Sequence, residues 1–266
     1  MAPANPLSPE VLALLKKKTG LDDAEAWRNI WLLISKSEQN NEDVDKAFLT
    51  DKGKSLFGYA SALSYDQHKR GVTLGIVGWT TGNNGKDGKG DAPELFKVYK
   101  NLGGDDLMPY CDGCCKSKDK CEKLINKIKD IQDDPKWIQA QWEQLVVKDG
   151  YLFETMAAFK KIGIEKPSAL AIGTVFDTSL NQGFDGPDGG CEHLVKLGVK
   201  GNEDKTLEAY NKWRRKVAGT SEYNDPKSNG VHRADMYEEL RREKHFDLKG
   251  PDAAKAIKKA ISWNMK

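Results

Sequence analysis

The stretch Pro167-Ser-Ala-Leu-Ala-Ile-Gly-Thr-Val-Phe-Asp-Thr-Ser-Leu180 is apolar on nearly every side when it is wound as a helix. A helix without a polar face is buried inside a larger fold, so we predict a buried central helix over residues 167–181. Asp177 lies within this helix, and a buried carboxylate needs a partner of opposite charge or several hydrogen bonds. The stretch therefore predicts both the centre of the fold and a polar contact inside it.

Helical periodicity extends over most of the remaining chain. Ser8-Pro9 has the form of a helix cap followed by a first-turn proline, and Gly20 can end that helix. A second helix starts at Asp22 or Asp23, and its apolar residues recur every three or four positions until Glu38 is reached. The apolar stripe consists of Trp27, Ile30, Trp31 and Ile34. Further helices are predicted over residues 119–132, 135–160, 203–217 and 234–245.

The segment between the second helix and the cysteines is less regular. Residues 40–69 are polar and predict a loop with a short helix, whereas the alternation in Gly71-Val-Thr-Leu-Gly-Ile-Val-Gly78 predicts a strand. Residues 82–90 form a glycine-rich loop that leads to Asp91 and to a helix opened by Pro93. The chain is therefore predicted to be mainly helical with a small amount of sheet.

Length and composition limit the class of protein. The 266 residues suffice for a single domain, 1–266, made of one body or two closely packed lobes. No apolar run approaches the roughly 18 residues that span a bilayer, which argues against an integral membrane protein. A formal charge of +2 is too small to indicate a nucleic acid or another strongly charged partner, and we expect a monomer.

The cysteines and the opening residues bear on the compartment. Four of the five cysteines lie between positions 111 and 121, which favours disulfides formed in an oxidising compartment. The five are Cys111, Cys114, Cys115, Cys121 and Cys191. A zinc knuckle is the alternative, but a second close Cys or His pair is missing. One cysteine is left over or pairs between chains. The opening Met1-Ala-Pro-Ala-Asn-Pro6 has no signal-peptide pattern and suits a mature secreted domain with an added start Met.

Glu38 is the first candidate for a catalytic residue. Two carboxyl groups, one protonated and one ionised, suffice to cleave a glycosidic bond, and the proton donor needs an apolar setting. The apolar stripe that leads to Glu38 offers such a setting. Among 40 acidic residues, however, a Glu at a helix end is most often a solvated surface group.

Several motifs resemble the glycoside hydrolase family 46 chitosanases, in particular their Bacillus members. The signature consists of Leu33-Ile-Ser-Lys-Ser-Glu38-Gln39, Arg70-Gly71-Val-Thr73-Leu-Gly75-Ile-Val-Gly78 and Asp91. Further likeness lies in Leu7-Ser-Pro-Glu-Val-Leu12, Thr19-Gly-Leu-Asp22, Leu95-Phe-Lys-Val-Tyr99, Ile172–Gly183 and Trp263-Asn-Met-Lys266. The resemblance covers nearly the whole chain. It implies a lysozyme-like α+β fold with two helical lobes, a small antiparallel sheet in the N-terminal lobe and a central buried helix beneath a sugar-binding cleft.

The resemblance also implies an inverting, endo-acting cleavage of chitosan with Glu38 as general acid. The family places its general base, an Asp, two residues before Arg-Gly, but His68 stands there, and Asp66 precedes it by two residues. The gap from Glu38 to Arg70 is also roughly ten residues longer than in the relatives. Three interpretations stay open, namely Asp66 as base, His68 as base, or altered activity in which neither acts.

Supporting roles follow from the same resemblance. Thr73 is implied to hold the attacking water, and Arg70 to line the cleft. Asp91 is implied to meet a glucosamine ammonium group, although it also suits a helix N-cap before Pro93.

Three further residues are implied to form an ion network behind Glu38. They are Asp177, Arg215 and Arg233, with Arg214 as a possible replacement for Arg215.

Other readings remain. The implied partners are chitosan or glucosamine oligosaccharides, and neither a metal nor a cofactor is expected. A same-fold hydrolase of another amino-sugar polymer is one alternative, and a chitosan-binding protein without turnover is the other. Trp79, directly after the predicted strand, is a candidate for the cleft wall. His193, His232 and His245 share no metal-ligand spacing.

Overall fold

The chain divides into two compact units, each of which is discontinuous in sequence. Unit 1 comprises Met1–Leu14 and Phe48–Val147, and unit 2 comprises Leu15–Ala47 and Lys148–Lys266. The computed structural model describes residues 5–39, 42–50, 52–61, 71–82, 90–111, 118–186, 189–218 and 229–262. Helices predominate in these ranges and the strands form one small sheet, so the predicted mainly helical α+β class is confirmed.

Unit 1 packs around two buried tryptophans of one helix. Trp137 Nε1 donates to the carbonyl of Phe57 at 2.7 Å, and the Trp137 ring meets the Tyr99 ring edge-on at 5.3 Å between centroids. Trp142 meets Phe48 in the same edge-on manner. Its elements are the first residues of α1 (Pro9–Thr19), η2 (Leu56–Gly58), β1 (Ala60–Ser61), β2 (Thr73–Leu74), β3 (Trp79–Thr80), α4 (Ala92–Asn101), α5 (Met108–Cys111), α6 (Lys118–Asp130) and α7 (Pro135–Val146).

The sheet of unit 1 corrects one prediction. The strands pair antiparallel in the order β1-β2-β3, with Thr73 opposite both Ser61 and Thr80. The single strand predicted over residues 71–78 is wrong, because β2 ends at Leu74 and residues 75–78 form a turn. Gly75 and Gly78 have φ angles of +73° and +77°, which L-residues with a side chain rarely adopt. The glycines therefore reverse the chain instead of interrupting a strand.

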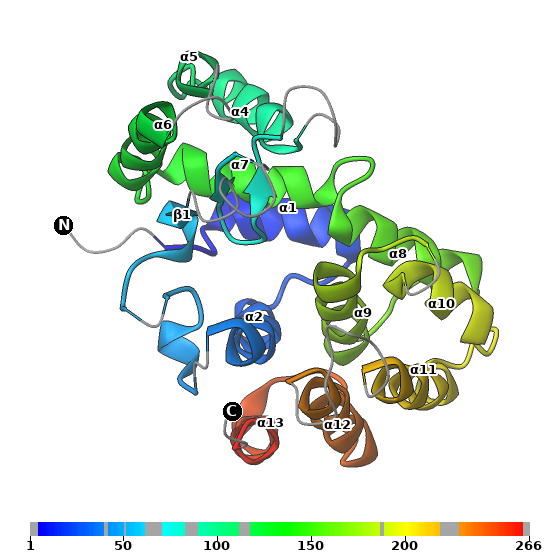
Figure 1. Ribbon diagram of the computed structural model, residues 1–266. Coiled ribbons are helices and arrows are strands. Elements are labelled where there is room, and N and C mark those ends of the chain that lie inside the picture. The colour runs from blue at the N-terminus through cyan, green and yellow to red at the C-terminus, as the bar shows by residue number, and fades with distance from the viewer. Residues whose placement is uncertain are drawn as a thin grey trace. The chain divides into compact units, whose positions relative to one another are not determined.

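Unit 2 is built around α9 (Ala169–Gln182), which matches the predicted central helix. Every residue from Ala169 to Ser179 is buried, and the Ser168 hydroxyl caps the helix by accepting from the Ala171 amide. Figure 1 shows the other helices arranged around α9. They are α2 (Ala24–Gln39), α8 (Tyr151–Lys161), α10 (Gly190–Leu197), α11 (Glu203–Ala218) and α12 (Asn229–Arg242), followed by α13 (Gly250–Ala260). The short helix η1 (Val44–Lys46) follows α2.

The helix predicted over residues 135–160 is two helices. α7 ends at Val146 and α8 begins at Tyr151, and the residues between them include Asp149 with a φ of +66°. Gly150 is the N-cap of α8. A residue in the left-handed region cannot continue an α-helix, so the apolar periodicity on both sides spans two separate segments.

Candidate active site

Glu38 lies on the last turn of α2 and is held by an arginine of α12. Arg233 Nη2 lies 2.8 Å from Glu38 Oε1, and the side chain of Glu38 is 51% exposed. The apolar surroundings expected for Glu38 are therefore not found, because the apolar stripe of α2 ends before it and a guanidinium faces it. The result is an accessible carboxyl group whose orientation is fixed by a charge-assisted contact.

Behind this contact lies a fully buried ion network. Arg233 Nη2 donates to Asp177 Oδ1 at 2.6 Å and Arg233 Nε donates to Oδ2 at 3.3 Å. Arg214 Nη2 donates to the same Oδ2 at 2.8 Å. Asp177 of α9 therefore joins α11 and α12, and Arg233 connects this buried carboxylate to Glu38.

The charged groups of the network shift one another's pKa values. Burial alone would raise the pKa of Asp177, but Arg233 and Arg214 together hold this pKa below its ordinary value. Burial alone would lower the pKa of Arg233, but Asp177 and then Glu38 outweigh it and raise the pKa above its ordinary value. Two cations and one buried anion thus leave positive charge facing Glu38.

Arg215 does not belong to this network, which corrects the prediction. Arg215 Nε donates to Asp235 Oδ1 at 2.7 Å at the surface, with 60% of the Arg215 side chain exposed. Arg214 takes the inward position, where its guanidinium also lies 5.5 Å from the centre of the Tyr237 ring. Adjacent helix positions point about 100° apart, so only one of the two arginines can face α9.

A small residue brings α2 close to α9. A Cβ added to Gly173 of α9 would lie 3.3 Å from Ile30 Cγ1 of α2. Ile30 belongs to the apolar stripe that precedes Glu38, and it is fully buried. Close packing of these two helices therefore sets the position of the helix that carries Glu38 relative to the network on α9.

In unit 1, Thr73 lies on the central strand β2 and is partly exposed. The turn that follows β2 is fixed by Gln141 of α7, a fully buried residue. Gln141 Oε1 accepts from the Ile76 amide at 2.9 Å, and Gln141 Nε2 donates to the Phe57 carbonyl at 3.1 Å. Gln141 is not among the residues predicted from the sequence, although a glutamine between Trp137 and Trp142 on an apolar helix is the available signal.

Asp91 stands at the N-cap position of α4, but its side chain caps no helix amide. Asp91 Oδ1 instead accepts from the Thr80 amide at 2.6 Å, which ties the start of α4 to β3. Desolvation of the carboxyl by the surrounding protein raises the pKa of Asp91, although the residue is exposed at the surface and the Thr80 amide opposes the shift. A carboxyl group beside the sheet edge is thus available to a cation.

Asp66, His68 and Arg70 lie outside the described residues, as do Cys114 and Cys115, so the base assignment and the disulfides of the cluster stay predictions. Cys191 is a free thiol, buried beside Ser179. Trp79 is 3% exposed, so it packs in the core of unit 1 rather than lining a sugar site.

The described ranges contain no group of three or more His, Cys, Asp or Glu side chains that could hold a metal ion. His193 stacks on Trp213 with ring centroids 4.0 Å apart, which joins α10 to α11. None of the helices in the described ranges has both the length and the apolar character required to cross a membrane.

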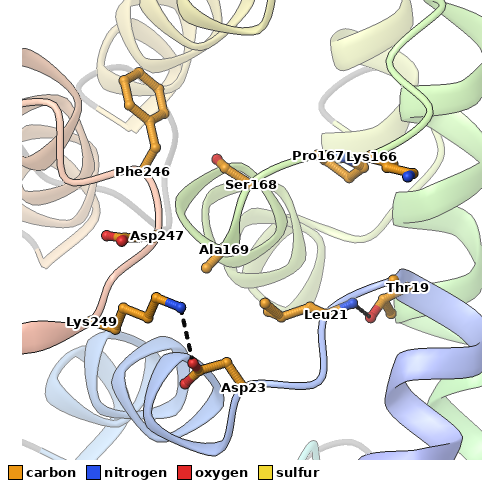
Figure 2. A pocket seen from close by; sticks show the side chains of 11 residues that line it. Thr19, Leu21, Asp23, Lys166, Pro167, Ser168, Ala169, Phe246, Asp247 and Lys249 are labelled. Carbon is orange, nitrogen blue, oxygen red and sulfur yellow. Dashed lines mark hydrogen bonds and ion pairs between the residues drawn. The ribbon is translucent and has the colours of Figure 1, made fainter.

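Unit 2 also has a pocket of about 260 Å³ at the start of α9 (Figure 2). It contains none of the predicted site residues, and Lys249 at its edge pairs with Asp23 at 3.2 Å. The first amides of α9 are already bonded, since Leu170 donates to the Phe246 carbonyl and Ser168 donates to Glu203. The helix end therefore has no free amides at these positions for an anion.

Similarity to characterised proteins spans the whole chain. The chain is 31% identical over 280 residues to a chitosanase from Niallia circulans, and the match covers 100% of this chain and 86% of the relative. No protein-family model matches the chain.

Solved structures show the same fold. A mutant chitosanase from Bacillus subtilis, crystallised with 6 GlcN, superposes with a TM-score of 0.60 at 22% identity, covering 86% of this chain and 93% of that one. A family 46 chitosanase from Gynuella sunshinyii, solved with chitotetraose, gives a TM-score of 0.62 at 21% identity with the same coverage. The lysozyme-like fold expected from the sequence is thereby confirmed.

Proposed function

Because the chain belongs to the chitosanases of glycoside hydrolase family 46, we propose that it cleaves β-1,4-glycosidic bonds within chitosan, with inversion at the anomeric carbon. The observation that carries the proposal is the similarity to the Niallia circulans chitosanase over the full length of the chain. The accessible, oriented carboxyl group of Glu38 agrees with it.

Glu38 is the proposed general acid. It gives its proton to the glycosidic oxygen while the bond from that oxygen to the anomeric carbon breaks. Its exposure lets a polymer reach it, and Arg233 fixes the direction of its carboxyl group. Asp177 and Arg214 form a buried ion network with Arg233 and keep Arg233 in place, so the network acts by positioning and not by proton transfer.

Asp66 is the proposed general base, with His68 as the competing residue. The base removes a proton from water while the water oxygen bonds to the opposite face of the anomeric carbon. Thr73 on β2 is proposed to bind this water. Arg70 is proposed to contact the substrate. Inverting enzymes separate their two carboxyl groups by about 6.5 to 9.5 Å to leave room for the water.

Asp91 is the proposed partner of a glucosamine ammonium group. Because the pKa of Asp91 is raised, its carboxylate forms at higher pH than that of an ordinary Asp. Binding of the cationic sugar should therefore strengthen as the pH rises through this pKa, as long as the amine itself stays protonated. Secretion, which the clustered cysteines favour, and a monomeric state belong to the same proposal.

The test compares wild type with Glu38→Gln, Asp66→Asn and His68→Ala on highly deacetylated chitosan. Reducing ends measure cleavage, product length distinguishes internal from terminal attack, and NMR of the first-formed anomer reports inversion. We expect Glu38→Gln and Asp66→Asn to lose activity by at least about 100-fold while melting like the wild type. His68→Ala is the matched control, since it changes a ring two residues away and should stay active.

If His68→Ala loses activity and Asp66→Asn keeps it, the imidazole of His68 is the general base. The replacement of the family's Asp by His68 also favours a second candidate, a chitosan-binding protein without turnover. A wild type that binds chitosan but releases no reducing ends would support that candidate and overturn the proposed hydrolysis. If reducing ends are released only from acetylated chitin or peptidoglycan, the proposed substrate is wrong and the proposed reaction class, glycoside hydrolysis, is kept.

A further inference from the structure

Lys36, two residues before Glu38, is a fully buried cation on α2. Its side chain is 0% exposed, and its Nζ lies 2.6 Å from Glu42 Oε1. Glu42 comes four residues after Glu38 and is itself largely exposed. An ammonium group is buried at this depth only when an anion compensates it, so the carboxylate of Glu42 is part of what keeps Lys36 inside.

The segment Glu42–Ala47, named here the return segment, lies along α2. Two of its carboxylates pair with α2, Glu42 with Lys36 and Asp45 with Arg28 at 3.5 Å. Arg28 and Lys36 are eight residues apart and therefore lie on one face of α2, with Leu32 between them. Because the later acidic residue meets the earlier cation, the return segment runs antiparallel to α2.

Local contacts stiffen the return segment. Asp43 caps η1 by accepting from the Asp45 amide at 2.9 Å. Ala47, at the end of the segment, and Leu32 of α2 are both buried. The return segment is thus locally folded and packs on α2, whose last turn carries Glu38.

The two ion pairs differ in where they act. Lys36 and Glu42 lie on either side of Glu38 in the chain, so their contact joins residues that flank Glu38. Arg28 and Asp45 join the same two elements more than two turns of helix away from Glu38 and are exposed. Arg233 contacts the carboxyl end of Glu38, whereas the Lys36–Glu42 pair contacts α2 two residues before Glu38 and so acts on the last turn of the helix.

We propose that Lys36 and Glu42 are positioning residues that hold the last turn of α2, and with it Glu38, in the geometry needed for proton transfer. The inference rests on the proposed role of Glu38 as general acid. A misplacement of about 1 Å can cost about 100-fold in rate, so a loosened turn should lower kcat while leaving the sugar contacts and KM nearly unchanged.

The experiment uses the full chain with chitosan as substrate. Glu42→Gln should lower kcat by about 10-fold or more with KM within about 2-fold of wild type. Glu42→Asp, which keeps the charge on a shorter arm, should recover part of the loss. Asp45→Asn is the matched control, since it removes the other carboxylate of the return segment and should leave kcat unchanged.

The double variant Lys36→Met with Glu42→Gln removes the buried charge together with the carboxylate of Glu42. It should melt near wild type and still show the lowered kcat, which separates positioning from stability. Hydrogen exchange gives a readout without catalysis, because amides of residues 36–39 should exchange at least about 10-fold faster in Glu42→Gln than in Asp45→Asn.

Unchanged kcat and unchanged exchange in Glu42→Gln would overturn the inference, as would an equal loss in Asp45→Asn. Failure of the proposed function looks different. In that case wild type releases no reducing ends, or Glu38→Gln stays active, while the exchange experiment still reports on the Lys36–Glu42 contact by itself.

Discussion

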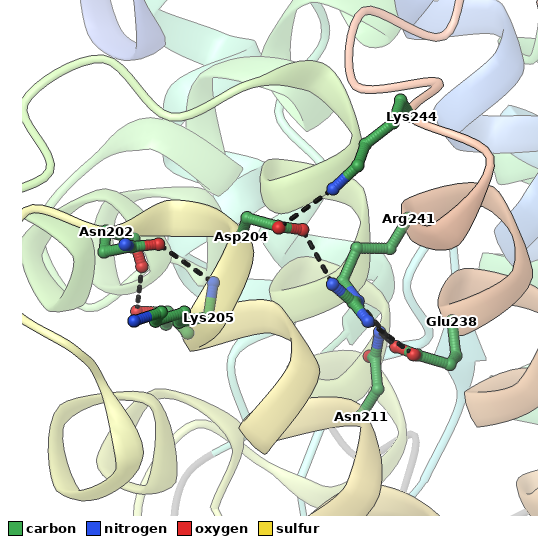
Figure 3. Close-up of polar contacts among 8 residues, drawn as sticks. Asn202, Asp204, Lys205, Asn211, Glu238, Arg241 and Lys244 are labelled. Carbon is green, nitrogen blue, oxygen red and sulfur yellow. Dashed lines mark hydrogen bonds and ion pairs between the residues drawn. The ribbon is translucent and has the colours of Figure 1, made fainter.

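Two ion networks join α12 to its neighbours in unit 2, and they differ in burial. In the first, Asp177 and Arg214 are 0% and 1% exposed, and Arg233 is 4% exposed. In the second, shown in Figure 3, Arg241 bonds both Glu238 and Asp204, and Lys244 bonds Asp204 from the surface. Asp204 is 42% exposed and Lys244 is 61% exposed.

The difference in burial decides what each network can do. A buried charge cannot exchange its ionic partner for water. The buried network therefore has one arrangement and can hold Arg233 against Glu38. Charges near water exchange partners with solvent at little cost, so the surface network contributes modestly to the α11–α12 contact. The same residue types therefore orient Glu38, the proposed general acid, in one place and support a helix pair in the other.

The largest expected effect comes from Asp177→Asn. It removes the buried anion that Arg214 and Arg233 share, which should lower the free energy of unfolding by about 3–5 kcal/mol and the melting temperature by roughly 10 °C. Calorimetry measures both. Asp235→Asn, which removes the surface partner of Arg215, is the control and should change stability by less than about 0.5 kcal/mol. Similar melting of the two variants would remove the distinction between the networks.

Acid should erase the stability difference between wild type and Asp177→Asn. The pKa of Asp177 is lowered in the folded protein, so its contribution is fully present above the ordinary pKa of 3.8 and is lost as pH falls through the folded value. Melting temperatures measured from neutral pH downward should therefore converge only below pH 3.8. Convergence well above that pH would mean that Asp177 is not held ionised by its arginines.

Arg241→Met should have an intermediate effect. Arg241 is 9% exposed and binds Glu238 through two nitrogens, but Asp204 and Glu238 both reach water and are not left buried. We expect a loss of about 1 kcal/mol in urea unfolding, with no change in the kcat for chitosan. Arg214→Met is the comparison, since it should cost more than Arg241→Met and should also lower kcat through Arg233.

Lys244→Gln should have the smallest effect. Its exposed pair with Asp204 is worth less than about 0.5 kcal/mol at low salt, and 1 M salt should abolish even that because the screening length falls to about 3 Å. Parallel melts at low and high salt test this. The difference between Asp177→Asn and wild type should persist in the same salt, since water does not reach that site.

The sequence pattern located most helices because their apolar residues repeat at helical spacing over many turns. The central helix around Asp177 and the helix that ends in Glu38 lie within a few residues of their predicted bounds. The pattern failed where one local backbone angle overrides it, as at Asp149 between α7 and α8 and at Gly75 after β2. The hydropathy pattern of the neighbouring residues does not reveal such an angle.

The candidate site was predictable only through family motifs. Glu38 and Asp91 come from matching positions, whereas no periodicity distinguishes them from other acidic residues. Gln141 was missed because a buried amide is recognised by the groups it bonds, here Ile76 and Phe57, which are 65 and 84 residues away in the chain.

The sequence by itself determined the helical class, the buried character of α9 and the need for a cation or several hydrogen bonds beside Asp177. Only the tertiary structure decided that this cation is Arg214 rather than Arg215, and that Glu38 faces Arg233 instead of an apolar surface. Hydropathy and spacing are properties of a single segment, so they survive in the sequence. The choice between neighbouring side chains depends on how α9, α11 and α12 pack, and that packing is set by contacts between residues distant in the chain.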